Sequence, residues 1–211
     1  MKIEKKIEIK HTPKAVEYND SLNFMENRVS EINSNINKEL IWFLHHNHIF
    51  TLGTSGKENE LHSKINIPLI KTNRGGKITY HGKGQLVFYF VINLKKRKIN
   101  IRSLVFKIEK TLINTLNYFK IKTFADRKNI GIWYKNKKHF KKVAAIGIKV
   151  KKWIAYHGFA INISNDLNKY NKIIPCGLDS SKISSLQKIK KQNYQKIKNK
   201  LIDNFLFNIE N

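Results

Sequence analysis

Apolar residues recur with helical spacing in three parts of the chain. Positions 101, 104, 105, 108, 112, 113 and 116 are all apolar, which predicts a long amphipathic helix over residues 101–120. A looser pattern of the same kind predicts a helix over residues 21–40, with Ser21 as its N-cap. From Ser184 onward, Lys and Gln are interspersed with Ile, Leu and Phe at similar spacing, so the C-terminal tail is also predicted to be helical.

Shorter apolar runs, bounded by turn residues, predict strands. The predicted strands are residues 41–53, 65–73, 85–94, 130–134, 143–154 and 157–163. The sequence shows no internal repeat and no linker rich in Pro, Gly or Ser between these segments. We therefore predict a single domain over residues 1–211 of the α/β class, with a mixed α+β arrangement of helices and strands.

Length and composition are those of a protein with one hydrophobic core. The chain has 211 residues, of which 41% are hydrophobic, and this is enough for one well-packed core. No run approaches the roughly 20 apolar residues of a membrane span, and the opening residues lack the apolar segment of a secretory signal. One cysteine cannot form an internal disulfide. We therefore expect a cytoplasmic protein that does not bind a membrane.

The chain is strongly basic, with 41 Lys and Arg residues against 15 Asp and Glu residues and a formal net charge of +26. Such a charge is typical of proteins with a polyanionic partner such as nucleic acid, a membrane surface or an acidic protein. Lys, Asn and Ile are all abundant, however, as AT-rich codons would produce. With one cysteine no zinc finger is possible. A basic nucleic-acid-binding module of another kind stays the non-enzymatic alternative.

The single cysteine, Cys176, lies in the segment IIPCGLD. Pro175 restricts the backbone before the thiol, and Gly177 allows a close turn after it. Such a corner can hold a side chain at the mouth of a pocket. Free cysteines are also among the most buried residue types, so Cys176 alone is either a small hydrophobe or a nucleophile.

Residues 74–85, RGGKITYHGKGQ, hold four of the ten glycines of the chain. Glycines let backbone N–H groups approach a ligand closely. The spacing fits neither a P-loop nor a dinucleotide fingerprint, so it favours an acyl or carboxyl ligand over a phosphate. An ordinary hairpin turn is the alternative interpretation.

Two further groups of residues have an ordinary structural explanation when taken alone. Lys142 would be one of many surface lysines, and His157 would be a hydrogen-bonded structural histidine. His46 and His48, in the segment HHNH, would share one face of a strand, but no third ligand of suitable spacing follows, which disfavours a metal site.

Taken together and in order, these segments resemble one family. The strings WFLHHNHIFTLG, TNRGGKITYHGKGQLVFY, IGIWY, KKVAAIGIKVKKWIAYHGFAINI and IIPCGLD, between Trp42 and Leu186, are similar to those of the lipoyl(octanoyl) transferases of lipoate biosynthesis. One departure is visible, because Lys83 stands where the family usually has proline between the glycines of HGPGQ.

This resemblance implies a set of site residues. Cys176 matches the nucleophile that becomes an acyl thioester, and Lys142, directly before VAAIG, matches the lysine that activates it; Lys141 falls outside the motif. The matching acyl-binding residues are Arg74, Gly75, Gly76, Lys77, Ile78, Thr79, Tyr80 and His81, then Ala145, Ile146 and Gly147, then Gly158, Phe159 and Ala160. The implied fold is that of the biotin and lipoate protein ligase catalytic domain. No metal, nucleotide or other cofactor is implied.

The implied reaction moves an octanoyl group from octanoyl-acyl carrier protein, through the cysteine, to a lysine amine. The acceptors would be apo lipoyl domains of 2-oxoacid dehydrogenases and the glycine cleavage H protein, and we expect a monomer that binds no nucleic acid. A free thiol with a pKa of about 8.5 is only partly thiolate at pH 7, and a nearby ammonium group favours the thiolate. Two enzymes of the same fold remain as alternatives: an ATP-dependent lipoate–protein ligase and an octanoyl relay amidotransferase.

Overall fold

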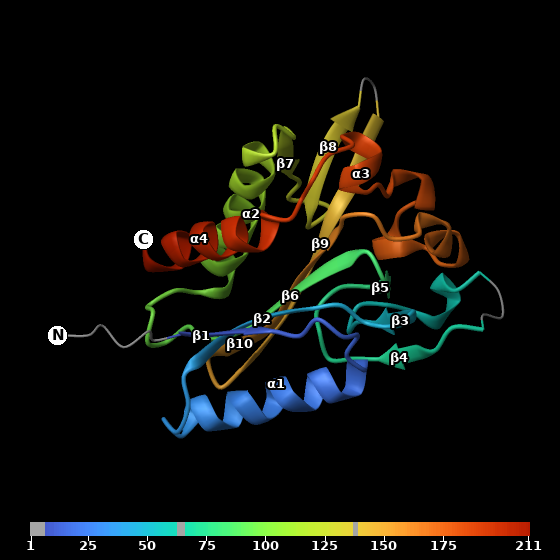
Figure 1. The fold of residues 1–211 in the computed structure, drawn as a ribbon. Helices are drawn as coiled ribbons and strands as arrows, with labels where there is room; N and C mark the ends of the chain where they lie inside the picture. The colour runs from blue at the N-terminus through green and yellow to red at the C-terminus, as the bar shows by residue number, and fades with distance from the viewer. Residues whose placement is uncertain (1–6, 63–65, 137–138) are drawn as a thin grey trace.

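A seven-stranded sheet crosses the centre of the computed structural model, which describes residues 7–62, 66–136 and 139–211 and, of Cys176, the backbone alone (Figure 1). Its strands, in spatial order, are β1 (Ile7–His11), β2 (Glu39–Leu44), β6 (Gln85–Asn93), β10 (Ile154–Asn162), β9 (His139–Lys151), β8 (Ile132–Asn136) and β7 (Thr123–Ala125). The pair β1–β2 is parallel, and the other neighbouring strands are antiparallel.

Helices cover both faces of this sheet (Figure 1). On one face, α1 (Tyr18–Asn33) packs against the odd-numbered side chains of β6, such as Tyr89. On the other face, α2 (Ile101–Tyr118) and α4 (Ile197–Glu210) pack against its even-numbered side chains, such as Phe88. Because successive side chains of a strand point to opposite faces, a central strand buried on both sides needs an uninterrupted apolar run.

A second, smaller sheet has three strands. In it β4 (Leu69–Lys71) and β5 (Ile78–His81) flank β3 (Ile49–Leu52). It has its own apolar cluster. Short 3₁₀ turns at Glu58–Glu60, Leu167–Lys172, Pro175–Gly177 and Ser180–Lys182, and the short helix α3 (Leu186–Ile189), complete the described elements. The Pro175–Gly177 turn lies against β5, so the cysteine segment meets the glycine-rich segment here.

The strongest predictions from periodicity are confirmed, since α2 and β6 match the predicted helix and strand. The predicted helix over residues 21–40 is wrong at both ends, because α1 starts at Tyr18 and ends before β2. Ser21 is not an N-cap: its hydroxyl is buried inside the helix and donates to the Tyr18 carbonyl at 2.7 Å. A hydroxyl can cap a helix or bond back to an earlier turn, and the sequence does not decide between them.

Two predicted strands each proved to be a pair. Residues 41–53 contribute to β2 and β3, which belong to different sheets and are separated by residues 45–48. Residues 143–154 run through the β9–β10 hairpin, whose turn residues Lys152 and Trp153 have φ values of 51° and 61°. This left-handed pair makes a tight hairpin turn without the glycine or asparagine that usually marks one.

The remaining differences concern short elements. Only three residues of the predicted strand 65–73 form β4, none of them buried, and Ile65 lies outside the described residues. The predicted C-terminal helix is interrupted between α3 and α4. Strands β1, β5 and β7 were not predicted. Within the described ranges, no helix combines the length and apolar character that crossing a bilayer requires.

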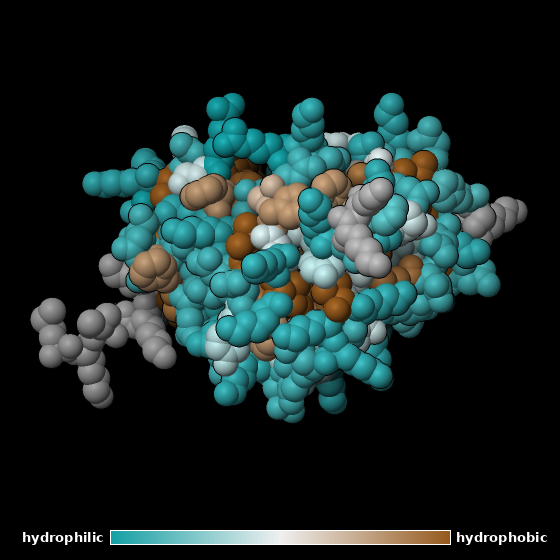
Figure 2. All heavy atoms as spheres, turned by 90° about the horizontal axis from the view of Figure 1, so that it is seen from above, coloured by the Kyte–Doolittle hydropathy of each residue, from teal (hydrophilic) through white to brown (hydrophobic). Residues whose placement is uncertain are grey.

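Hydrophilic side chains cover most of the face seen in Figure 2, and apolar ones show in the gaps between them. The exposed aromatic side chains include Phe106 on α2, Phe140 on β9 and Trp153 in the β9–β10 turn. Scattered exposed apolar residues are normal for a folded protein, so they do not by themselves mark an interface.

Phe88 packs within the apolar cluster between the large sheet and the helices α2 and α4, and replacing it tests the fold. Its ring lies 4.9 Å from Phe43, 4.5 Å from Phe159 and 5.1 Å from Phe205 between centroids, and it is fully buried. Phe88→Ala should lower the free energy of unfolding by about 3–5 kcal/mol, because it leaves a cavity. Urea unfolding measures this.

The matched control is Phe106→Ala, on α2, because Phe106 is 65% exposed. This substitution should change the free energy of unfolding by less than about 0.5 kcal/mol. Equal losses for the two variants would contradict the placement of Phe88 in the core.

Candidate active site

Lys142 lies where β9 departs from regular pairing. The register between β8 and β9 shifts between Ile132 and Trp133, so Val143 is an extra residue on β9. Such a β-bulge changes the direction of nearby side chains and often lies beside an active site. The Lys142 backbone is held in place from the other side, where the Ser184 amide donates to the Lys142 carbonyl at 2.9 Å.

The Lys142 side chain is buried against β8, with only 4% of the residue exposed. Its Nζ lies 5.5 Å from the centre of the Trp133 ring, within range of a cation–π interaction. A Cβ atom on Gly131 would lie 2.4 Å from Lys142 Cε and 3.2 Å from Nζ. Among the described residues, no carboxylate forms an ion pair with Lys142. The Trp133 ring, and the space that Gly131 leaves free because glycine has no side chain, therefore position the Lys142 amine.

The PCG segment forms a single 3₁₀ turn over Pro175–Gly177. Gly177 has a φ of +75°, in the left-handed region that favours glycine. The Ile174 amide donates to the Glu60 carbonyl at 2.7 Å, and the Glu60 carboxylate forms a 3.0 Å ion pair with Lys77. Because Lys77 belongs to the glycine-rich segment, Glu60 joins the turn to that segment. The Cys176 side chain lies outside the described part of the structure.

Lys142 and Pro175 line the same small cavity, together with side chains of β5, β6 and β10. Three of its lining residues, Thr79, Ala145 and Ala160, also line a neighbouring cleft. The lysine, the residue that precedes Cys176 and the cleft are therefore connected through these three residues.

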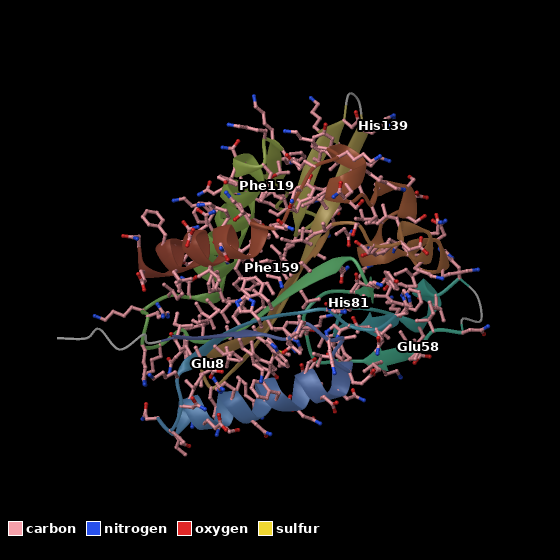
Figure 3. The ribbon with its side chains drawn as sticks, in the orientation of Figure 1. Glu8, Glu58, His81, Phe119, His139 and Phe159 are labelled. Carbon is pink, nitrogen blue, oxygen red and sulfur yellow. The ribbon has the colours of Figure 1, made fainter. Side chains whose placement is uncertain are left out.

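The cleft lies between the two sheets, near His81 at the end of β5 and Phe159 on β10 (Figure 3). Its free volume is about 50 Å³, which is room for one or two water molecules. An eight-carbon chain therefore needs side chains to move before it can enter. The cleft is lined by Arg74, Gly76, Lys77, Thr79, His81, Val87, Tyr89, Ala145, Ile146, Gly147, His157, Gly158, Phe159 and Ala160.

Three of the residues expected to bind an acyl chain lie outside this lining. Gly75 lies in the loop that bonds to β9. Ile78 and Tyr80 are fully buried in the apolar cluster of the small sheet. Thr79 and His81, between and after them on β5, line the cleft. This is the alternation of a strand, and the sequence pattern does not predict a strand for these residues.

The glycines of the loop meet β9 at backbone distance. The Gly75 amide donates to the Ile148 carbonyl at 3.1 Å, and a Cβ on Gly147 would lie 2.9 Å from the Gly75 carbonyl. Gly76 has a φ of +91°, a conformation that side chains other than glycine rarely adopt. Glycine is thus required at Gly75 and Gly147 for close packing of the loop on β9, and at Gly76 for the turn.

Arg74 lies buried beneath the loop, with 9% of the residue exposed. Its Nη2 donates to the carbonyl and the hydroxyl of Thr51, each at 2.7 Å, and its Nη1 donates to the Gly75 carbonyl. Among the described residues, Arg74 has no carboxylate partner. The positive charge of Arg74 is therefore not neutralised by any of these carboxylates, and it acts on the groups around the cleft.

Two histidines line the cleft in their neutral form. Burial, helped by other cationic groups including Arg74, lowers the pKa of His81 to about 3, and burial with the charge of Arg74 lowers the pKa of His157 to about 3. His157 also has a φ of +68°, a strained conformation of the kind that concentrates at functional sites. From the sequence alone His157 is a structural, hydrogen-bonded histidine, and nothing in the sequence signals its backbone conformation.

The histidines of the HHNH segment serve hydrogen bonds within the fold. His46 Nδ1 lies 2.7 Å from the Val16 carbonyl and its Nε2 lies 2.9 Å from the Tyr89 hydroxyl, while His48 Nδ1 lies 2.5 Å from the Tyr80 hydroxyl. The described ranges contain no group of three His, Cys, Asp or Glu side chains that could hold a metal ion.

Known proteins resemble this chain in both sequence and fold. The family model for the lipoyl protein ligase A/B catalytic domain matches residues 17–206. An octanoyltransferase of Rickettsia felis is 43% identical over 84% of this chain and 86% of its own length, and one of Rickettsia prowazekii is 44% identical over 82% and 85%.

Among solved structures, a bipartite lipoate protein ligase from Thermoplasma acidophilum has a TM-score of 0.72, with 15% identity over 95% of this chain and 82% of its own. A biotin protein ligase from Aquifex aeolicus has a TM-score of 0.54, with 15% identity over 98% and 71%. At such identities the likeness shows the fold alone, and it confirms the predicted mixed α/β fold of the biotin and lipoate ligase catalytic domain.

The buried neutral histidines predict how stability depends on pH. The pKa of His46 is lowered to about 4 by burial, and those of His81 and His157 to about 3. An unfolded histidine titrates at about 6.5, so the unfolded chain binds more protons as the pH falls. The contribution of these three histidines to the free energy of unfolding should be constant above pH 7. It should decrease as the pH falls below 6.5.

Urea unfolding between pH 7 and pH 5 measures this slope, which should correspond to an uptake of about three protons on unfolding near pH 5. His46→Gln should remove about one proton from the slope, and His62→Gln, at an exposed position, should leave it unchanged. A slope close to zero in the parent protein would contradict the neutral buried histidines.

Proposed function

This chain belongs to the lipoyl protein ligase A/B catalytic domain family, and from that premise we propose that it is an octanoyltransferase. It moves an octanoyl group from an acyl carrier protein, through a thioester on Cys176, to the lysine amine of a lipoyl domain. The observation that carries the proposal is that Lys142 and Pro175, the residue before Cys176, line one cavity connected to the glycine-walled cleft.

In the first step the Cys176 thiol gives its proton to the Lys142 amine, and the thiolate attacks the carbonyl carbon of the octanoyl thioester. The new C–S bond forms as the bond to the carrier's pantetheine sulfur breaks. That sulfur leaves as a thiolate and takes the proton from Lys142. Burial against Trp133, with no carboxylate of the described residues paired to it, supports this role because it keeps water and competing anions from the amine.

In the second step the acceptor lysine amine attacks the acyl-enzyme. An amide bond forms and the Cys176–acyl bond breaks, while the proton lost by the attacking nitrogen passes through Lys142 to the Cys176 thiolate. The thioester is already activated, so neither step requires ATP or a metal. Two successive transfers through one acyl-enzyme predict ping-pong kinetics.

An ATP-dependent lipoate–protein ligase is the main alternative within the same fold. The lipoate–protein ligases among the solved structures compared are only 15–16% identical to this chain, so they carry no argument about its reaction. The relatives at 43–44% identity are octanoyltransferases. This supports transfer from a thioester over ligation.

The partners follow from the reaction and suit the charge of the chain. Acyl carrier proteins and many lipoyl domains are acidic, so a basic enzyme increases their rate of encounter more than their final affinity. We propose octanoyl-acyl carrier protein as donor, and lipoyl domains of 2-oxoacid dehydrogenases and the glycine cleavage H protein as acceptors, in the cytoplasm. A charge of +26 exceeds what this steering needs, so codon composition accounts for part of it.

The direct test of the proposal is intact mass after mixing with octanoyl-acyl carrier protein in the absence of ATP. The protein should gain the mass of one octanoyl group, and an apo lipoyl domain should then remove it. Cys176→Ser should show no stable adduct and almost no transfer, because serine has no alkoxide at neutral pH. Octanoyl transfer by Cys176→Ser at the parent rate, or an absolute need for ATP, would rule out the proposal.

The role of Lys142 is tested by the rate of Cys176 alkylation with iodoacetamide as a function of pH. In Lys142→Ala, half-maximal reactivity should move up towards pH 8.5, the value for an ordinary cysteine, and octanoyl transfer should fall by orders of magnitude. Lys141→Ala is the matched control, because the Lys141 amine bonds to the Ser181 carbonyl outside the cavity. Its curve should match the parent's, and a larger effect at Lys141 would place the activating amine one residue earlier.

A further inference from the structure

An ion pair lies between the glycine-rich segment and the turn that contains Cys176. The Glu60 carboxylate is 3.0 Å from the Lys77 amine, and only 7% of the Glu60 side chain is exposed, against 43% of the Lys77 side chain. A second Glu60 carboxylate oxygen accepts from the Ile78 amide at 3.4 Å. Burying a carboxylate costs free energy unless it is paired and hydrogen-bonded. Both of these contacts are made by the glycine-rich segment, so the Glu60 side chain is anchored there.

The backbone of Glu60 is paired with the residues that lead into the Pro175–Gly177 turn. The Ile174 amide donates to the Glu60 carbonyl at 2.7 Å, and the neighbouring residues Leu61 and Ile173 form an antiparallel bridge. The main chain of Glu60 is thus fixed to the start of the turn, while its side chain is fixed to the glycine-rich segment.

The Lys77 side chain meets the same turn at its other end. A Cβ atom on Gly177 would lie 2.8 Å from Lys77 Nζ, 3.3 Å from its Cδ and 3.4 Å from its Cε. The end of the Lys77 side chain therefore lies against the Gly177 backbone, in space that is free because glycine has no side chain. The Pro175–Gly177 turn is held at its start by the Glu60 carbonyl and at its end by Lys77, and the ion pair joins these two supports.

Lys77 also lines the cleft between the two sheets. The free volume of this cleft is about 50 Å³, so side chains of its wall have to move when an acyl chain enters. If Lys77 left Gly177 at that moment, the turn would lose one support just when its cysteine has to meet the acyl carbonyl. A displacement of about 1 Å can lower the rate of a reaction roughly a hundredfold. The ion pair to Glu60 opposes this movement.

We propose that Glu60 and Lys77 are positioning residues for the transfer: their ion pair holds the Cys176 turn in place against the cleft while the acyl chain is seated. This inference rests on the proposed octanoyl transfer. The pair acts on the rate of acyl-enzyme formation and not on the affinity for the donor, and it takes no part in proton transfer.

The test follows acyl-enzyme formation in a single turnover at increasing concentrations of octanoyl-acyl carrier protein. Glu60→Gln keeps the shape of the side chain and Lys77→Met keeps its length, and each removes one charge of the pair. Each should lower the maximal rate about tenfold or more, with the half-saturating concentration within about threefold of the parent value. The double variant should be no slower than the slower single variant, because all three lack the same interaction. Lys77→Arg, which can still pair with Glu60, should recover most of the lost rate.

The matched control is a second ion pair in the same region. Glu58 lies on the same 3₁₀ turn as Glu60 and is labelled in Figure 3. Its carboxylate is 2.7 Å from the Lys71 amine, but both side chains are mostly exposed, and neither residue lines the cleft. Glu58→Gln and Lys71→Met should leave both the maximal rate and the half-saturating concentration unchanged.

Hydrogen exchange provides a measurement that needs no turnover. The Gly177 amide donates to the Ile174 carbonyl at 3.1 Å and the Leu178 amide to the Pro175 carbonyl at 3.0 Å, so their exchange reports how often the turn opens. Both variants that break the pair should speed this exchange about tenfold or more, while the amides of β6 keep the parent rate. Glu58→Gln should leave the exchange of the turn unchanged.

The outcomes separate this inference from the proposed function. If the parent protein forms no acyl-enzyme, octanoyl transfer fails, and hydrogen exchange alone decides on the pair. If Glu60→Gln does not fold, Lys77→Met and Lys77→Arg carry the test, because the Lys77 side chain is 43% exposed. Parent-like exchange of the turn or a parent-like maximal rate in Lys77→Met overturns the inference. So does a loss confined to the half-saturating concentration, or a loss in Lys77→Met that folded Glu60→Gln does not share.

Discussion

The backbone contact between Gly75 and β9 determines how the two sheets meet. The loop lies close enough for the Gly75 amide to bond to the Ile148 carbonyl and for the Gly75 carbonyl to occupy the space of a Cβ on Gly147. A side chain on Gly147 would push the loop away. Without this approach the loop would lie farther from β9, which would change the cleft between Arg74 on one side and β9 on the other.

Sequence periodicity predicted the elements that are long and buried, such as α2 and β6, because their apolar positions repeat over many residues. It failed for short strands and for hairpins whose turns lack glycine, as at Lys152 and Trp153. Those residues adopt left-handed conformations because the strands on either side require it. No local pattern reports such a tertiary requirement.

The candidate site was predictable in part. Motif order pointed to Cys176 and Lys142, and the structure brings Lys142 to the turn that contains the cysteine. The supports of Lys142 were not predictable, because Trp133 and Gly131 act through a cation–π contact and through empty space. Likewise, the orientation of the His157 ring depends on Asn73, a partner that lies 84 residues away in the sequence.

The extra residue at Val143 has a consequence for how this enzyme can change. Lys142 and Ala145 are three residues apart, so a regular strand would point their side chains to opposite faces. The extra residue at Val143 restores a common face, and it is what lets both residues line one cavity. The irregularity in the pairing therefore limits insertions and deletions in this strand: its length is set by the chemistry at one end and the cleft at the other.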